Sequence, residues 1–268
     1  MVPDRVLVLP AYMAGLHATA AVSAVTFARH THDVFGVGVI RRGAQRSASG
    51  RGTVEAGAGD VITVNPGEVH DGAPVDGTRA WQMVYLEPAL VREAATEAGI
   101  PSPAMVELRQ PVIRDESLAV AMLRLFHAAI DPGDAELRRE EALSYLLGTL
   151  LARYASRRPA GTGAPGRTIR ARRRLQDDPA ASVSLAELAT DCGLSRFQLI
   201  RAFRRETGLT PHAYQVSLRV QAARRLIVAG VPLAEAALTA GFTDQSHMNR
   251  VFLRHTGATP RAWASAMA

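Results

Sequence analysis

Hydrophobic residues change their spacing near Pro88. Before it, short runs of β-branched and aromatic residues are separated by clusters of Gly, Asp and Pro, a pattern typical of strands joined by tight turns. The clearest runs are residues 22–27, 34–40, 61–64 and 81–86. Turns are expected at Arg42-Gly43, Gly50-Arg51-Gly52, Gly57-Ala58-Gly59-Asp60, Pro66-Gly67 and Asp76-Gly77. Many short strands at this spacing predict a sandwich or a small barrel.

After Pro88 the apolar positions recur at helical spacing. Helices are expected at residues 89–99, 115–130 and 135–154. Residues 156–166, rich in Arg, Pro and Gly, contain almost nothing to bury and predict a linker. From Arg167 to the end the pattern is helical throughout. The chain is therefore expected to be an α+β protein with a β-rich domain at residues 1–155 and an all-α domain at residues 167–268.

Residues 6–28 contain no Asp, Glu, Lys or Arg, and Ala18-Thr19-Ala20 is similar to a signal-peptidase site. Pro10, Gly15 and His17 divide the stretch into short apolar runs, so we expect buried strands rather than a signal peptide or a membrane span. The single cysteine, Cys192, excludes an internal disulfide and fits a reducing compartment. A cytoplasmic protein is expected.

One five-residue pattern in the all-α part occurs twice. Thr207-Gly208-Leu209-Thr210-Pro211 recurs 49 positions later as Thr256-Gly257-Ala258-Thr259-Pro260. Gly ends helices in a left-handed turn, and Thr-Pro caps and begins the next helix. Upstream, residues 184–195 match residues 232–243 at a spacing of 48. The second copy therefore carries one extra residue after its turn.

Each copy has the local signals of a helix-turn-helix. In the first, Ser184 and Glu187 form an S-x-x-E capping box that begins a short helix. Gly193 permits a sharp turn, and Ser195 caps a second helix that ends before Gly208. Together these elements make a helix-turn-helix. Two such units are expected, at residues 183–206 and 231–255.

The two parts of the chain differ in charge. Residues 1–166 hold 16 Arg and 18 Asp or Glu, a net charge of −2, whereas residues 167–268 hold 15 Arg and 7 Asp or Glu, a net charge of +8. All 31 basic residues are Arg, a bias that we attribute to the composition of the coding sequence. A basic helical domain with two helix-turn-helix units predicts DNA binding.

The second helix of each unit is the one expected in the major groove. Its buried face is expected to contain Leu199, Ala202, Phe203, Met248, Val251 and Phe252. The DNA-binding side chains are expected on the opposite face: Arg196, Phe197, Ile200, Arg201, Arg204, Gln245, Ser246, Asn249, Arg250 and Arg254. Gln and Asn suit adenine edges, and Arg suits guanine or phosphate. For Arg204, Arg205 and Arg254 we expect a phosphate contact or a solvent-exposed charge rather than a contact with a base.

The sequences SLAELATDCGLSRFQLIRAFRRETGLTP and GFTDQSHMNRVFLRHTGATPRAW both contain Phe-x-x-x-x-Gly-x-x-Pro. Over residues 167–265 the chain resembles the DNA-binding domain of the AraC/XylS family of transcription regulators. The resemblance implies two helix-turn-helix units bridged by one long helix, here residues 211–229, with recognition helices in successive major-groove segments of one DNA face. It places the base-reading positions at Phe197, Ile200, Arg201, Gln245, Ser246, Asn249 and Arg250. The implied partners are promoter or operator DNA and RNA polymerase.

Two segments of the β-rich part contain histidines and resemble the two motifs of the cupin barrel. They are His30-Thr31-His32 and residues 59–70, which end at His70. The resemblance implies a cupin-like β-barrel with flanking helices that senses a small-molecule effector. The pocket candidates are His30, His32, His70, Trp81 and Tyr85. Trp81 and Tyr85 have the alternative role of core residues.

A metal site is the alternative for the three histidines, because imidazoles from two strands can bind Fe, Mn, Ni or Zn. The cupin metal site also has a Glu a few residues after the His-x-His pair, where this chain has Phe35-Gly36-Val37-Gly38. No metal and no other cofactor is therefore expected. Histidines that only hydrogen-bond within the barrel, or a domain used only for assembly, are the further alternatives.

The helices at residues 115–154 have apolar stripes that exceed what one barrel face needs. They predict the surface of a homodimer.

Two functions fit these patterns. The first is an effector-responsive, sequence-specific transcription regulator, an activator by family habit and not an enzyme. The second is a cupin-type metalloenzyme, such as a dioxygenase or an isomerase, with an accessory DNA-binding domain. The missing carboxylate and the complete pair of helix-turn-helix units favour the first. The sequence has no Ser/His/Asp triad, Gly-rich phosphate loop or paired carboxylate spacing above chance, so no catalytic residue is expected.

Overall fold

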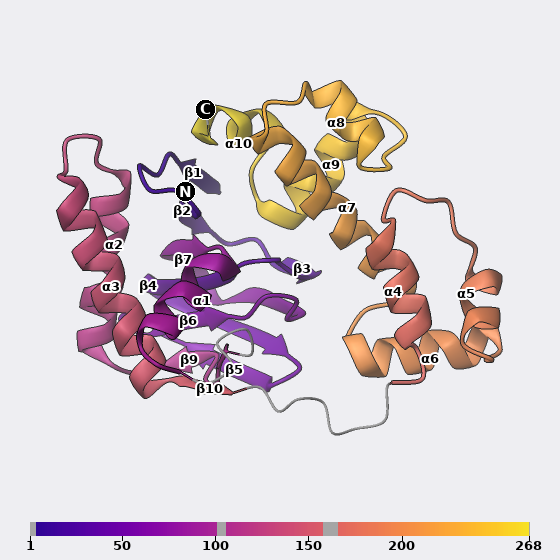
Figure 1. Ribbon diagram of the computed structural model, residues 1–268, viewed down its shortest axis with the longest axis horizontal. Helices are drawn as coiled ribbons and strands as arrows, with labels where there is room; N and C mark the ends of the chain where they lie inside the picture. The colour runs from indigo at the N-terminus through magenta and orange to yellow at the C-terminus, as the bar shows by residue number, and fades with distance from the viewer. Residues whose placement is uncertain (1–3, 101–105, 158–165, 268) are drawn as a thin grey trace. The chain divides into compact units, whose positions relative to one another are not determined.

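The structure, a computed structural model, describes residues 4–100, 106–157 and 166–267 (Figure 1). It divides into two compact units: the first contains residues 4–27, 32–100 and 106–157, and the second contains residues 28–31 and 166–266. Residues 158–165 of the predicted linker lie outside the described residues, so the bounds of the linker stay a prediction. Ser156 and Arg157, also expected there, belong instead to a short strand, β10 (Ala155–Arg157), which pairs with β8 (Val106–Leu108).

The β-rich part of the chain contains an eight-stranded sheet in the order β1-β2-β7-β4-β6-β9, with β3 beside β7 and β5 beside β4. Neighbours along this order pair antiparallel. The strands are β1 (Arg5–Leu9), β2 (Leu16–Ser23), β3 (Phe27–His30), β4 (Phe35–Ser49), β5 (Gly52–Ala56), β6 (Val61–Val64), β7 (His70–Leu86) and β9 (Val112–Ile113). The uncharged stretch at residues 6–28 thus supplies β1, β2 and the beginning of β3.

Two of the expected turns lie inside strands, and those two predictions were wrong. Arg42-Gly43 falls within β4 and Asp76-Gly77 within β7, where the pairing register of the two strands shifts on both sides of Arg42. Gly43 has a φ of 71°, and a Cβ there would lie 2.8 Å from the carbonyl oxygen of Thr78. The glycine therefore permits a bulge that bends the strand pair without ending it.

One expected strand is interrupted instead. Residues 24–26 separate β2 from β3, although the sequence pattern predicted a strand at residues 22–27. The Oγ atom of Ser23 accepts a hydrogen bond from the Val25 amide at 3.0 Å. This local bond offers the backbone an alternative to the strand ladder, which explains the break.

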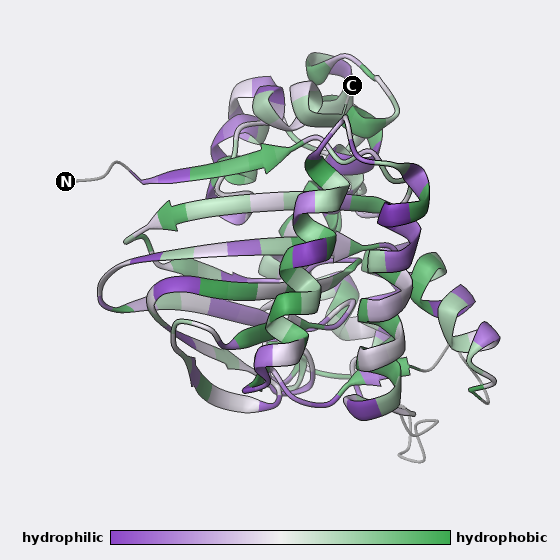
Figure 2. Cartoon of the chain, turned by 90° about the vertical axis from the view of Figure 1, so that its left-hand side faces the viewer, coloured by the Kyte–Doolittle hydropathy of each residue, from purple (hydrophilic) through white to green (hydrophobic). Residues whose placement is uncertain are grey.

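The two faces of the sheet are covered differently. One face packs in a large apolar core with three helices, α1 (Pro88–Glu97), α2 (Glu116–Ile130) and α3 (Glu136–Arg153). Figure 2 shows α2 and α3 crossing in front of the strands, with both hydrophobic and hydrophilic residues on their outer faces. The other face carries a smaller apolar cluster: Ala21, Ile40, Ala56, Ile62, Trp81 and Met83. This second face is the one that holds the pocket candidates.

Residues 166–267 form helices joined by turns. The helices are α4 (Ile169–Asp177), α5 (Leu185–Asp191), α6 (Arg196–Thr207), α7 (Pro211–Val228), α8 (Leu233–Thr239), α9 (Gln245–Thr256) and α10 (Pro260–Met267). Helices α5 and α6 form the first helix-turn-helix, and α8 and α9 form the second. Helix α7 packs against α4, α6, α8 and α9, so it bridges the two. The expected α+β class with a β-rich first domain and a helical second domain is confirmed.

Along the described ranges, none of the helices combines the length and the apolar character needed to cross a membrane.

Candidate DNA-binding helices and ligand pocket

Helix α6 begins and ends on signals carried by its own sequence. The Ser195 hydroxyl accepts a hydrogen bond from the Gln198 amide at 3.3 Å, and the Gln198 side chain accepts one from the Ser195 amide at 3.0 Å. At the other end, Gly208 adopts a left-handed conformation with a φ of 80°. These contacts satisfy polar groups at both ends of the helix, so its exposed face is held on a well-defined element.

Helix α9 is capped differently. Its N-cap is Asp244, whose Oδ1 atom accepts a hydrogen bond from the His247 amide at 2.7 Å. At the spacing of 48, the counterpart of Ser195 is Thr243, but the extra residue in the turn moves the cap to Asp244. Helix α9 then ends at Gly257, with a φ of 74°, as α6 does at Gly208. Helices α6 and α9 therefore end at the C-terminus in the same way, at a left-handed glycine. At the N-terminus they differ, because the cap of α6 is a neutral Ser and the cap of α9 is an Asp carboxylate.

The buried faces of both helices lie where the sequence placed them. Leu199, Ala202 and Phe203 of α6 are buried, as are Met248 and Phe252 of α9. Val251, expected with them, is half-buried. Aromatic contacts pack each helix against a neighbour. The ring centroids of Phe203 in α6 and Tyr214 in α7 lie 5.5 Å apart, and those of Phe252 in α9 and Trp263 in α10 lie 6.0 Å apart.

The side chains proposed to contact DNA lie on the opposite faces. The exposed ones are Arg196, Phe197, Arg201, Arg204, Gln245, Ser246, Asn249, Arg250 and Arg254, while Ile200 is half-buried. Phe197 is 83% exposed, which is unusual for an aromatic side chain in a folded domain. An exposed phenyl ring at the start of a recognition helix suits contact with a thymine methyl group.

Helix α5 is fixed by a network at the base of the first helix-turn-helix. Glu187 accepts hydrogen bonds from the amide and the hydroxyl of Ser184, at 2.8 and 2.7 Å, which completes the predicted capping box. Arg174 of α4 binds Glu187 at 3.0 Å and Asp191 at 2.9 Å. The hydrogen bonds from Ser184, followed by those from Arg174, lower the pKa of Glu187 to about 2. An ionised Glu187 therefore ties α4 to α5.

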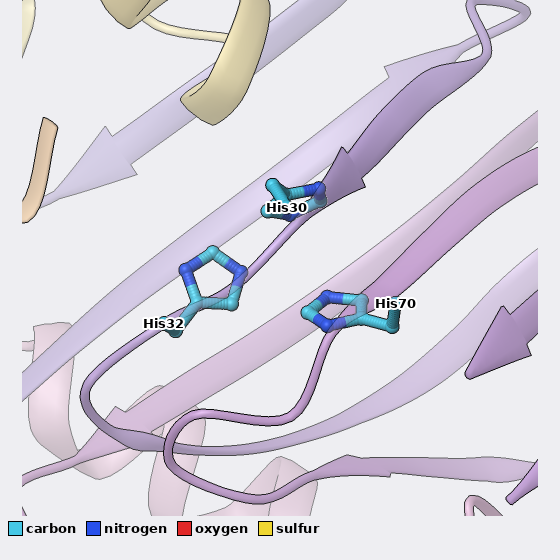
Figure 3. Close-up of side chains that lie close together, drawn as sticks. All are labelled: His30, His32 and His70. Carbon is cyan, nitrogen blue, oxygen red and sulfur yellow. The ribbon is translucent and has the colours of Figure 1, made fainter. Parts of the chain in front are cut away.

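Three of the five pocket candidates come together. His30 ends β3, His32 follows it, and His70 begins β7 (Figure 3). One possible ligand nitrogen from each ring lies within 4.8 Å of the other two. His30 is buried and the other two histidines are half-buried. The His-x-His pair and the distant His70 are thus neighbours, which their separation in the sequence alone did not show.

Tyr85 lies next to this group, and Trp81 lies further along the same strand face. The Tyr85 ring is 5.5 Å from that of His32. Trp81, buried in the small apolar cluster, is edge-on to Phe27 at 6.0 Å and lies below the Arg79 guanidinium at 4.8 Å. Trp81 therefore belongs to the small apolar cluster, whereas Tyr85 lies beside the histidines.

His17 lies on the same sheet face as the pocket candidates and was not predicted from the sequence. It pairs with Tyr85 across β2 and β7, and the two rings stack with their centroids 4.6 Å apart and their planes 9° from parallel. The neighbours of His17, Leu16 and Ala18, point into the core on the other face of the sheet. Strand alternation within residues 16–23 was therefore the signal that would have placed His17 on the pocket face.

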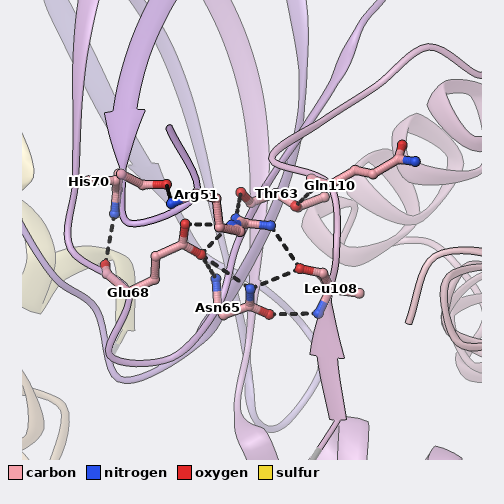
Figure 4. A network of polar contacts seen from close by, with 8 residues as sticks. Arg51, Thr63, Asn65, Glu68, His70, Leu108 and Gln110 are labelled. Carbon is pink, nitrogen blue, oxygen red and sulfur yellow. Dashed lines mark hydrogen bonds and ion pairs between the residues drawn. The ribbon is translucent and has the colours of Figure 1, made fainter. Parts of the chain in front are cut away.

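A polar network supports the loop that leads to His70 (Figure 4). Arg51 binds Glu68 and donates to the carbonyl oxygens of Leu108 at 2.7 Å and Thr63 at 3.2 Å. Asn65 exchanges two hydrogen bonds with Leu108, at 3.0 and 2.8 Å. Burial opposes ionisation of Glu68, but the hydrogen bonds and charge of Arg51 outweigh it, so the pKa of Glu68 lies below its ordinary value.

This loop also joins the two histidine segments. The Gly67 amide donates to the carbonyl oxygen of His32 at 2.7 Å, and the Nδ1 atom of His70 lies 3.1 Å from the carbonyl oxygen of Glu68. Burial lowers the pKa of His70, which keeps the ring neutral at pH 7. The loop therefore holds the His70 ring, with its lowered pKa, on a fixed backbone.

Two family models match the chain. One, described as an AraC-like ligand binding domain, matches residues 12–147, and a helix-turn-helix domain model matches residues 188–266. The chain belongs to the AraC family of transcription regulators. This AraC-family chain is thus a DNA-binding regulator rather than an enzyme, which decides against the metalloenzyme alternative.

Individual relatives of this AraC-family regulator cover most of its length. It is 28% identical to the HTH-type transcriptional regulator YbfI of Bacillus subtilis, over 83% of this chain and 81% of the relative. It is 28% identical to the arabinose operon regulatory protein of Escherichia coli, over 75% of this chain and 70% of the relative. The crystal structure of ToxT from Vibrio cholerae has the same fold, with a TM-score of 0.56 over 96% and 99% of the two chains at 10% identity.

Proposed function

We propose that this AraC-family regulator is an effector-responsive activator that inserts α6 and α9 into successive major-groove segments of one DNA face. The observation that carries the proposal is the pair of exposed helix faces, each on a helix with its own caps and its own buried side. The major groove of B-DNA admits an α-helix, and successive segments on one face recur about every 10–10.5 base pairs. The net charge of +8 over residues 167–268 supplies the attraction to phosphates.

The two helices have different roles in this proposal. Helix α9 presents Gln245, Asn249 and Arg250, whose side chains match adenine and guanine edges. Helix α6 presents Arg196, Arg201 and Arg204 around an exposed Phe197. Arg201 is its main base reader, and the other cations position the helix on phosphates. Sequence discrimination therefore depends more on α9 than on α6.

The effector pocket lies on the sheet face that carries the small apolar cluster, and it has a wall of polar and aromatic rings and an apolar floor. Its wall consists of His17, His32, His70 and Tyr85, and its floor includes Trp81 and Met83. A few polar groups above an apolar surface are the usual lining of a small-molecule site. A small molecule with both polar and apolar parts fits this chemistry.

The regulator acts as a homodimer through α3. Leu137 and Tyr145 on this helix are 66% and 59% exposed. A Cβ placed at Gly148, one turn beyond Tyr145 on the same side, would meet nothing within 4 Å. Large exposed apolar side chains beside a bare glycine allow a second α3 to approach closely. Activation in turn needs contact with RNA polymerase, and one relative of similar length, from Shigella dysenteriae at 24% identity, is the HTH-type transcriptional activator RhaR.

Selection of genomic DNA fragments by the purified full-length protein tests the proposal. Footprinting of the selected sites should show two protected major-groove segments about one helical turn apart. Transcription from such a site by purified RNA polymerase should rise when the protein is added. A single protected segment would contradict the binding mode, and reduced transcription would contradict the role of activator.

A further inference from the structure

The last strand of the first unit, β10, belongs to a two-stranded sheet that is separate from the large one. It pairs with β8 over three residues on each strand. From β10 the chain continues to the second unit, whose description resumes at residue 166. Two strands of this length are marginally stable by themselves, so the docking of β10 depends on how firmly β8 is held.

The free edge of β8 is held by side chains instead of a third strand (Figure 4). The Arg109 amide donates to the carbonyl oxygen of Tyr154 at 3.0 Å, so the alternation of the ladder turns the N–H and C=O groups of Leu108 away from β10. The Asn65 carboxamide meets both groups: Oδ1 accepts from the Leu108 amide at 2.8 Å, and Nδ2 donates to the Leu108 carbonyl oxygen at 3.0 Å. Arg51 donates to the same oxygen at 2.7 Å. Asn65 thus takes the place of a peptide group in a neighbouring strand.

The same two side chains hold the loop that leads to His70. The Oε2 atom of Glu68 accepts a hydrogen bond from Nδ2 of Asn65 at 3.2 Å and one from Nη2 of Arg51 at 2.6 Å. The carbonyl oxygen of Glu68 lies 3.1 Å from Nδ1 of His70. Asn65 and Arg51 therefore cannot move without changing both the loop beside His70 and the edge of β8.

In the second unit, the chain is attached to a recognition helix near the point where its description resumes. The amide and the hydroxyl of Thr168 donate to Oε2 of Glu206, in the last turn of α6, at 3.2 and 2.6 Å. Thr168 is also the N-cap of α4 and is buried. Release of the three residues of β10 would lengthen the connection between β8 and this point by at most about 10 Å.

We propose that the β8–β10 pair is the regulatory element of the effector pocket. Occupation of the pocket beside His70 sets, through Asn65 and Arg51, whether β10 is docked, and docking sets the length of chain that leads to α6. The proposal rests on the proposed effector pocket and describes how that pocket acts on the DNA-binding part. Coupling between two sites is reciprocal, so docking of β10 must stabilise the loop as much as the loop stabilises β10.

Hydrogen exchange of the full-length protein tests the coupling from the loop to β10. Asn65→Ala removes both hydrogen bonds to Leu108, so the amides of Arg109 and of residues 155–157, which do not contact Asn65, should exchange at least about five-fold faster. The amides of β2 and β7 in the same variant report any overall loss of stability, and the increase at β10 must exceed theirs. The control is Arg46→Ala, which removes an exposed ion pair from the large sheet and should leave the exchange of β10 unchanged.

A disulfide tests the coupling from β10 to the loop. Glu107 and Ser156 are directly opposite in the register, at a separation that suits a disulfide. In a Cys192→Ser background, the oxidised Glu107→Cys, Ser156→Cys protein has β10 locked in place. The amides of Gly67 and Glu68, both hydrogen-bonded in the loop, should then exchange at least about three-fold more slowly than in the reduced protein.

The same oxidised and reduced proteins test the effect on DNA. Their affinities for the selected genomic fragments should differ by at least about three-fold, because the length of a connection changes how readily the attached unit reaches its site. Unchanged exchange in either experiment, or equal DNA affinity of the two forms, would overturn the proposal. If the unaltered protein bound no fragment, the proposed function would be contradicted, while the two exchange experiments would still decide whether the loop and β10 are coupled.

Discussion

Arg51 holds both carboxylate oxygens of Glu68, with its Nε atom 2.7 Å from Oε1 and its Nη2 atom 2.6 Å from Oε2. Only 18% and 11% of the two side chains are exposed. The pair also holds the loop that leads to His70, so a contact away from the three histidines fixes the backbone beside one of them. Fork-to-carboxylate pairing of this kind is both strong and directional.

Arg51→Ala should lower the free energy of unfolding of the first unit by about 3 kcal/mol, because it leaves the Glu68 carboxylate without its partner in a mostly buried site. Denaturant unfolding in a Trp263→Phe background, where Trp81 is the remaining tryptophan, measures the change. The control is Arg46→Ala, whose partner Glu55 lies at 2.6 Å but with both side chains more than half exposed. Arg46→Ala should lower the free energy of unfolding by less than about 1 kcal/mol. Equal decreases for the two variants would show that the Arg51 network stabilises the fold no more than an exposed ion pair does.

Replacing Arg250 and Arg205 should separate base reading from positioning. Arg250→Ala should cost about 1–3 kcal/mol at one cognate base pair and relax specificity there. Arg205→Ala should weaken binding to all sequences alike and reduce the salt slope by about 1. Titration of the cognate site and of single-base variants at several salt concentrations measures both. If the two replacements lower specific and random binding equally, the assignment of roles is wrong.

Tyr145→Glu should shift the protein from dimer to monomer, because it places a charge on the exposed face of α3. The expected change is at least about ten-fold in the dimer dissociation constant, measured by sedimentation of the full chain. The matched control is Val25→Glu, which introduces the same charge at another exposed apolar position of the first unit. A monomer in the unaltered protein, or equal effects of the two replacements, would exclude α3 as the interface.

The stability of the second unit should fall in acid through Glu187. Since the folded pKa of this carboxyl is lowered to about 2, its contribution is complete above the ordinary carboxyl pKa and is lost as the pH falls toward 2. Thermal melts of Trp81→Phe protein with and without Glu187→Gln, followed by the remaining Trp263 signal between about pH 6 and pH 2, measure this. The difference in melting temperature should be largest near pH 6 and shrink as the pH falls. A difference independent of pH would show that Glu187 acts only by packing.

Features set by residues close together in the sequence could be predicted, whereas features set by contacts between distant segments could not. The two helix-turn-helix units could be predicted because their determinants are local: Ser184 and Glu187 lie three residues apart, and Gly208 and Gly257 end their own helices. The exposed and buried faces of α6 and α9 then follow from helical periodicity.

The surroundings of the pocket candidates could be predicted only in part. His17 meets Tyr85 because β2 pairs with β7, a register set between segments far apart in the chain. The turn signal at Arg42-Gly43 proved to be a bulge, since the pairing of β4 with β7 continues past it. In both cases the deciding interactions are tertiary, and no short stretch of sequence contains them.

The caps of the two recognition helices have a consequence for how the regulator searches DNA. The N-terminus of α6, capped by neutral Ser195, keeps its partial positive charge available to phosphates, whereas the Asp244 carboxylate cancels that charge in α9. On random DNA we therefore expect the N-terminus of α6 to stay in contact with phosphates, while the Asp244 carboxylate repels α9 from the phosphates. At an operator, the base contacts of α9 compensate for this repulsion. Residence time on random DNA would then be set by one helix and lifetime at an operator by the other, so that scanning stays fast without weakening the final complex.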